Sequence, residues 1–173
     1  MIASVPTIET ERLRLRALSE ADFGPLAAFY EDDRSRFVGG PKRRDETWRM
    51  LATEIGHWSL RGYGRFGVEE RDTGAFVGVI GPWNPHGWPE PELGWDLMNG
   101  FEGRGYATEA ARAARDYAYG TLGWTTAISL VADGNDGSAR VAERLGAVRE
   151  RHMDHPMFGP MSVYRHPAPE AAE

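Results

Sequence analysis

The stretch Glu92–Arg112, ELGWDLMNGFEGRGYATEAAR, governs the architecture of this chain because its residue pattern changes halfway along. Its first part alternates, with Leu93, Trp95 and Leu97 on one side, as expected of a half-buried strand. From about Arg104, small apolar residues recur with the period of a helix at Ala107, Ala110, Ala111, Ala114 and Ala118. The sequence therefore predicts a strand that passes through a glycine-rich turn into an amphipathic helix.

The turn between this strand and this helix has the features of an anion site. Gly103 and Gly105 can adopt positive φ and let the backbone come close to a ligand. The first turn of the helix then offers N–H groups without an acceptor in the helix, at the positive end of its dipole. A phosphate or pyrophosphate fits such a turn without any dedicated basic side chain. The alternative is a tight turn whose glycines only reverse the chain.

Two common phosphate-binding motifs match this turn poorly. No Lys-Ser or Lys-Thr pair follows its second glycine, which argues against a P-loop. Residues 103–108 match only the first half of the dinucleotide fingerprint G-x-G-x-x-G/A, and the chain after Thr108 is short for a doubly wound sheet. A nicotinamide-dependent oxidoreductase is therefore disfavoured.

Two segments together resemble the N-acetyltransferases of the GNAT superfamily. Glu102–Ala107, EGRGYA, is similar to their acetyl-CoA pyrophosphate loop, usually written Q/R-x-x-G-x-G/A. The following TEAA (108–111) resembles the RimJ/RimL branch, which acetylates ribosomal-protein N-termini. Asn135–Ala147, NDGSARVAERLGA, resembles that branch's N-x-x-S-x-R-V-x-E-x-L-G segment. Their order and separation also agree, so the resemblance covers nearly the whole chain.

The resemblance implies acetyl-CoA as co-substrate and assigns residues to it. The implied cofactor-binding residues are Leu97, Glu102, Gly103, Arg104, Gly105, Tyr106, Ala107, Thr108 and Asn135. Asn135 would reach the pantetheine arm, although an asparagine there is also a good helix N-cap. Leu97 lies where the family uses strand N–H groups to hold the thioester. Glu102 departs from the usual Gln or Arg, and its charge is unfavourable near a pyrophosphate unless it points away or pairs with Arg104.

Acetyl transfer to an amine needs a proton acceptor, stabilisation of an oxyanion and a proton donor for the thiolate. Glu92 is the candidate acceptor, because its position relative to Glu102 matches the family's catalytic glutamate. Desolvation by Trp83, Trp88 and Trp95 would raise its pKa. The alternatives are a carboxylate in water or one that binds a cationic substrate group.

Two further residues are candidates for chemistry. Asp96 lies on the same face of the strand as Glu92 and is the reserve base. Ser138 is the candidate beside the sulfur, at a helix where many family members have a tyrosine and this chain has none. A serine at that position also commonly bonds the helix N-terminus, so its role as a general acid stays open.

The segment Pro82–Pro89, PWNPHGWP, is predicted to be irregular because it holds three prolines in eight residues. Trp83, His86 and Trp88 are predicted to line a substrate pocket, with His86 as a contact or auxiliary base. The alternative is a packed rim that only shields the sheet.

The composition of the chain indicates the number of domains and argues against several classes of partner and site. The 173 residues, 41% hydrophobic and 27% charged, predict one domain over residues 1–173, with a frayed tail at 167–173. A net charge of −6 argues against a nucleic-acid partner. The chain has no cysteine and no H-E-x-x-H, so neither disulfides nor a metal site are expected. No signal peptide or membrane-spanning stretch is present, which favours a cytoplasmic protein with no membrane partner.

The remaining elements complete the predicted fold. Strands are expected at 13–18, 65–70, 75–81, 92–97, 125–131, 148–153 and 161–166, and helices at 19–30, 45–60, 104–120 and 138–145. In the second helix, Trp48, Leu51, Ile55 and Trp58 are expected in the core. The sum is a mixed α/β (α+β) sandwich with a mainly antiparallel sheet, one central parallel pair and helices on both faces, which is the arrangement that the GNAT resemblance implies.

The sequence thus predicts an N-acetyltransferase that acts by direct attack of a primary amine, either a protein N-terminus or a small molecule. The alternative is a non-catalytic acyl-CoA-binding sensor or regulatory domain, which would tolerate loss of Glu92. An exposed hairpin near the C-terminus offers a surface for a homodimer.

Overall fold

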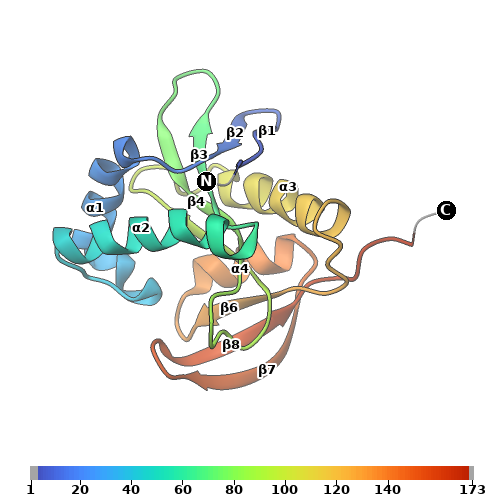
Figure 1. Ribbon diagram of the computed structural model, residues 1–173. Helices are drawn as coiled ribbons and strands as arrows, with labels where there is room; N and C mark the ends of the chain where they lie inside the picture. Colours follow the sequence, from blue (N-terminus) through green and yellow to red (C-terminus); the bar gives the residue numbers. More distant parts are fainter. Residues whose placement is uncertain (1–3, 172–173) are drawn as a thin grey trace.

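The computed structural model describes residues 4–171 and contains one eight-stranded sheet (Figure 1). In chain order the elements are β1 (Ile8–Glu9), β2 (Leu13–Arg16), the 3₁₀ helix η1 (Glu20–Asp22), α1 (Phe23–Glu31), the 3₁₀ helix η2 (Asp33–Val38), α2 (Arg44–Arg61), β3 (Phe66–Glu70), β4 (Phe76–Trp83), β5 (Glu92–Leu97), α3 (Tyr106–Gly120), β6 (Ile128–Ala132), α4 (Asp136–Arg144), β7 (Val148–His155) and β8 (Gly159–Arg165). The strand order is β1-β2-β3-β4-β5-β6-β8-β7. Among the strand pairs of residues 4–171, only β5 and β6 run parallel, as the sequence predicts.

Helix α3 packs through the alanine stripe that the sequence predicts. Five of its six alanines, those at positions 107, 110, 111, 114 and 118, are buried. Ala110, Ala111 and Ala114 pack against Leu15, Phe66 and Val77 of the sheet, because small side chains let a helix approach a sheet closely. This contact fixes the start of α3 beside the end of β5.

The other face of the sheet is covered by α1 and α2. Leu26 and Tyr30 of α1 and Leu51 of α2 form one cluster with Val79 and Met98. Figure 1 shows α1 and α2 together on one side, with the β3–β4 hairpin at one end and the β7–β8 hairpin at the other. Helices therefore cover both faces of the sheet, as predicted.

Strands β5 and β6 pair at a single position and then separate. Glu92 is opposite Ile128, and beyond that point two side chains bridge the opening. The backbone N–H of Leu130 donates to the Glu92 carboxylate (2.6 Å), and the Ser129 hydroxyl donates to the Leu93 carbonyl (2.6 Å). The result is a gap in the middle of the sheet with a buried carboxylate at its apex.

The structure corrects three predictions. Trp48 is 50% exposed, so it is not a core residue of α2. Strand β4 continues through Pro82 and Trp83, because β3 begins opposite Ile80 and no ladder bond is lost beside Pro82. Strand β5 is not half-buried: Glu92 on its polar side is only 7% exposed, since α2 and the loop after β4 cover that face.

The end of the described chain is partly anchored. The Tyr119 hydroxyl donates to the Pro167 carbonyl (2.7 Å), and residues 168–171 have no regular structure. The ends of the predicted domain, residues 1–3 and 172–173, lie outside the described residues. Within residues 4–171, no helix has the length and apolar content needed to cross a bilayer.

Candidate active site

Two cavities meet at the gap between β5 and β6. One, of about 450 Å³, lies against the start of α3 and is called the α3 cavity. The other, of about 480 Å³, lies against α2 and the loop after β4 and is called the α2 cavity. Both are lined by Phe37, Val38, Trp95, Asp96, Asn135 and Ser138. A ligand in one cavity can therefore reach a ligand in the other.

The α3 cavity contains the predicted glycine turn. Gly103 (φ +76°) and Gly105 (φ +77°) both have left-handed backbone conformations, and Gly105 is the N-cap of α3. Gly105, Tyr106, Ala107 and Thr108 line the cavity, so the free N–H groups of the first helical turn lie at its wall. The Thr108 hydroxyl oxygen is buried and has no hydrogen-bond partner among the described residues. An anion is the ligand that satisfies these donors.

Four arginines that the sequence analysis missed also line the α3 cavity. They are Arg34 and Arg36 from η2 and Arg140 and Arg144 from α4. In the described part of the chain, Arg140 and Arg144 make no ion pair within 4 Å. The i,i+4 spacing of Arg140 and Arg144 puts both side chains on one face of a helix, which the sequence could have indicated. The position of η2 at this cavity, in contrast, depends on the tertiary fold.

Glu102 is neutralised by a partner other than the expected one. Its carboxylate is 2.7 Å from the Arg34 guanidinium and also accepts the Gly100 N–H (2.8 Å). Arg104 pairs instead with Glu70 (3.3 Å). The negative charge of Glu102 is therefore balanced within the cavity wall.

Strand β5 turns the backbone groups of alternate residues toward the gap. The Leu93 carbonyl accepts from Ser129, and the Leu97 carbonyl accepts from Arg34 (3.4 Å), whereas the Met98 N–H bonds to β4. Because backbone groups alternate in direction along a strand, the N–H groups of Trp95 and Leu97 also face the gap. Leu97 lies where the sequence analysis placed a thioester-binding N–H.

Asn135 and Ser138 lie side by side at the start of α4. Asn135 is the N-cap, and its side-chain oxygen accepts the Ser138 N–H (3.3 Å), which leaves its NH₂ group facing both cavities. The Ser138 hydroxyl oxygen accepts the Trp95 indole N–H (2.9 Å). Its own O–H therefore remains available as a donor toward the gap.

Glu92 is the most strongly perturbed carboxyl group at the gap. Its two oxygens accept the Leu130 N–H and the Trp88 indole N–H (3.2 Å). Burial raises the pKa of Glu92 to about 7, although both hydrogen bonds and the nearby Arg65 lower it. Trp83, Trp88 and Trp95 all line the same cavity as Glu92, and the Trp95 indole N–H donates to the Ser138 hydroxyl.

Asp96 is held in a buried ion cluster that the sequence analysis did not predict. Its carboxylate is 3.0 Å from the Arg65 guanidinium and accepts the Tyr30 hydroxyl (3.3 Å). Arg65 also pairs with Glu54 of α2. Because Arg65 and Tyr30 already bond the Asp96 carboxylate, Asp96 is poorly placed to act as the reserve base.

The loop after β4 borders the α2 cavity with all three predicted residues. Trp83 and Trp88 are half-buried in its wall, and His86 is exposed at its edge. The Glu90 carboxylate bonds the Arg165 guanidinium (2.8 Å), which ties this loop to β8. The loop is thus part of a cavity wall rather than only a cover for the sheet.

A mixed sheet that opens at one parallel pair, with a glycine-rich helix start on one side and a buried carboxylate at the apex, defines an acyltransferase-type fold. The Acetyltransferase (GNAT) domain model matches residues 12–148, and the chain belongs to this family. It is an acetyltransferase.

Several known proteins are similar to this chain. YkkB of Bacillus subtilis (strain 168) is 32% identical over 148 residues, which cover 79% of this chain and 82% of YkkB. A crystal structure of the acetyltransferase from Agrobacterium tumefaciens str. C58 is 41% identical, covers 94% of this chain and 95% of its own, and has a TM-score of 0.86. RimL, a ribosomal L7/L12 alpha-N-protein acetyltransferase solved in complex with coenzyme A, shares the fold at 18% identity, with 93% and 97% coverage and a TM-score of 0.75.

Proposed function

We propose that this acetyltransferase uses acetyl-CoA and transfers its acetyl group to a primary amine by direct attack, with Glu92 as the proton acceptor. The observation that carries the proposal is the buried Glu92 carboxyl, with a pKa of about 7, at the apex of a gap between two cavities. A general base is most effective when its pKa lies near the working pH.

The α3 cavity is the proposed site of acetyl-CoA, which supplies the acetyl group as an activated thioester. The N–H groups at the start of α3 and the Thr108 hydroxyl would bind the pyrophosphate. Arg140 and Arg144 add positive charge to the same wall. Coenzyme A bound to RimL, which has the same fold, supports this choice of co-substrate.

At the gap, β5 and α4 would hold the thioester end. The Leu97 N–H would donate to the carbonyl oxygen as negative charge develops there, and the Asn135 NH₂ group to the pantetheine arm; both residues line the α3 cavity, which supports these roles. The Ser138 O–H can donate a hydrogen bond to the leaving sulfur. A serine hydroxyl is a weak acid, so we assign Ser138 stabilisation of the thiolate and not full proton transfer.

The α2 cavity is the proposed site of the amine. The substrate ammonium first gives one proton to the Glu92 carboxylate, and the neutral amine then attacks the thioester carbonyl. As the C–N bond forms and the C–S bond breaks, coenzyme A leaves as a thiolate, which takes up the second proton of the nitrogen. Trp88 and the Leu130 N–H hold that carboxylate in place through its two oxygens. A non-catalytic sensor would need neither a second cavity nor a carboxyl group poised near neutral pH, so this alternative is disfavoured.

The proposal is tested by free-thiol release from acetyl-CoA across an amine panel, together with calorimetric titration of acetyl-CoA. Wild type should release thiol only when an amine is present, and kcat/KM should rise with pH through about 7 as Glu92 loses its proton. Glu92→Gln should lower kcat by roughly 10²- to 10⁴-fold and abolish that inflection, while acetyl-CoA still binds.

Glu69→Gln is the matched control, because Glu69 is a strand glutamate that lines neither cavity. It should retain wild-type rates. Acetyl-CoA binding without turnover on any amine would favour the sensor. Equal rates for Glu92→Gln and wild type would overturn the role of Glu92.

A homodimer stays a prediction, and the structure suggests where it would form. β7 is at the end of the sheet order, and Val148 on it is 69% exposed. An exposed edge strand can pair with another chain. Sedimentation equilibrium of wild type and Val148→Lys would test this, since the charge should disrupt such a dimer.

A further inference from the structure

The α2 cavity has an aromatic side, formed by Trp83, Trp88 and Phe158, that the transfer reaction itself does not require; His57 and His155 contact these rings without lining the cavity. His57 stacks on Trp83 (centroids 4.5 Å apart), and Trp83 meets Trp88 edge-on (6.4 Å). Trp88 in turn contacts His155 (4.9 Å) and Phe158 (5.9 Å). Burial lowers the pKa of His57 and of His155, so both rings are neutral near pH 7. The aromatic side of the wall is therefore uncharged, whereas Lys42, Glu46 and Arg49 line the cavity elsewhere.

The floor of the same cavity carries excess negative charge. Three carboxyl groups, from Glu54, Glu92 and Asp96, are each less than 8% exposed, and they face one guanidinium, that of Arg65. Glu54 and Asp96 are both ion-paired to Arg65. The floor thus holds more carboxyl groups than cationic groups. A cationic group is the complement of this floor.

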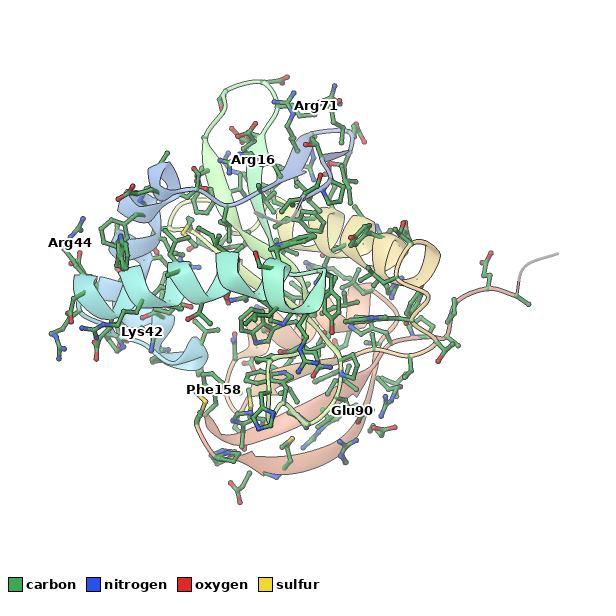
Figure 2. All side chains as sticks on the ribbon, viewed as in Figure 1. Arg16, Lys42, Arg44, Arg71, Glu90 and Phe158 are labelled. Carbon is green, nitrogen blue, oxygen red and sulfur yellow. The ribbon has the colours of Figure 1, made fainter. Side chains whose placement is uncertain are left out.

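One side of the cavity is bordered by a contact between two distant segments. Phe158 lies in the turn between β7 and β8, and its ring would be 2.9 Å from a Cβ placed on Gly39, just after η2. Lys42 approaches the same point, and Figure 2 shows Phe158 below the segment that carries Lys42. The contact of Phe158 with Trp88 joins this turn to the loop after β4, so the two segments border the cavity together.

We infer that the acceptor is a small cationic amine with an aromatic or branched apolar body, and not the N-terminus of a polypeptide. The inference deepens the proposed function and depends on it for the transfer step. The ammonium group lies at the carboxylate floor, and the apolar body packs against Trp83, Trp88 and Phe158. A cavity of about 480 Å³ is in the size range of small-molecule sites, roughly 300–1,000 Å³.

The kinetic test compares phenethylamine, ethanolamine and a tripeptide with a free N-terminal alanine in the thiol-release assay. For wild type, kcat/KM should be roughly 10- to 100-fold higher for phenethylamine than for ethanolamine, which is the effect of burying one phenyl group. The tripeptide should be a poorer substrate than phenethylamine, because its polar chain would have to lie along the aromatic rings of Trp83, Trp88 and Phe158 or pass the Phe158–Gly39 contact.

The variant test removes one ring of the wall. Phe158→Ala should raise KM for phenethylamine severalfold and narrow its advantage over the tripeptide, with little change in KM for ethanolamine or in acetyl-CoA affinity. Trp48→Ala is the matched control, since Trp48 is exposed on α2 and lines neither cavity. If Phe158→Ala does not fold, the wild-type preference series still decides the question.

Two results would overturn the inference: equal kcat/KM for phenethylamine and ethanolamine, or a tripeptide that matches or exceeds phenethylamine. Calorimetric titration of wild type with phenethylamine alone separates this inference from the proposed function. Phenethylamine binding without any acetyl transfer would leave the ligand class standing and reject the proposed function. Acetyl transfer with a preference for the tripeptide would support the proposed function and reject the inferred ligand class.

Discussion

Glu92 is both a buried carboxyl group and a bridge between two strands. Its oxygens replace the backbone acceptor that β5 would have offered the Leu130 N–H in a continuous parallel ladder. Burial keeps the proton on the folded protein up to about pH 7, whereas the free side chain loses it near 4.5. The same environment that suits Glu92 to accept a proton therefore makes stability depend on pH.

At the residue scale, Glu92→Gln should flatten that pH dependence. Because the folded pKa is raised, Glu92 contributes stability below about pH 4.5 that is lost as pH rises through about 7. The free energy of unfolding of wild type, relative to Glu92→Gln, should thus fall by about 3 kcal/mol from pH 4.5 to pH 8. Urea unfolding of both proteins at intervals across this range measures it, and parallel curves would contradict it.

At the element scale, the start of α3 depends on a left-handed backbone that only glycine adopts easily. Gly105 caps the helix at φ +77°, and a Cβ there would meet the Arg12 guanidinium at 3.4 Å. Arg12 itself bonds the Glu109 carboxylate and the Arg104 carbonyl. The direction of the free N–H groups is therefore set by one backbone conformation and one ion pair.

Gly105→Ala should cost about 1 kcal/mol or more of stability from backbone strain and should also weaken acetyl-CoA binding severalfold. Gly74→Ala is the matched control, because Gly74 has nearly the same φ (+74°) in the β3–β4 turn, with open space around it and no cavity nearby. Both variants should lose similar stability by urea unfolding. By calorimetry, only Gly105→Ala should lose affinity for acetyl-CoA, and a matching loss in Gly74→Ala would count against the cradle.

At the scale of the whole molecule, Arg65 joins parts that are far apart in the chain. Its guanidinium pairs with Glu54 of α2 and Asp96 of β5, and Asp96 is bonded by Tyr30 of α1. The side chain of Arg65 is 12% exposed, so the cluster lies mostly out of water. It holds the helical layer against the centre of the sheet and forms the floor of the α2 cavity.

Arg65→Met should destabilise the protein by roughly 3–5 kcal/mol, because it leaves two buried carboxylates without their cation. Arg14→Met is the matched control: Arg14 also pairs with two glutamates, Glu9 and Glu69, but at the surface, where the loss should be small. Urea unfolding compares the two. Equal losses of unfolding free energy in the two variants would show that burial does not make the Arg65 ion pairs more important for stability than the surface pairs of Arg14.

Patterns among neighbouring residues were enough to predict most of the helices and strands and several residues of the candidate site. The alternation along β5 and the alanine period along α3 are properties of neighbouring residues, so they can be read before folding. The glycine turn and the N-cap Asn135 are equally local, since each depends on one backbone conformation or one hydrogen bond within a few residues. The two motifs also indicated the GNAT family, which the domain match confirms.

The tertiary structure decided everything that depends on residues meeting across the chain. Arg34 reaches Glu102, Arg65 reaches Asp96, and Phe158 reaches Gly39 only because the sheet order and helix layers bring them together. The burial that raises the pKa of Glu92 also comes from several segments at once. Charge pairing and desolvation act through space between distant residues, so no pattern along the sequence contains them. The period of a strand or helix is a property of neighbouring residues, so the sequence by itself determines it.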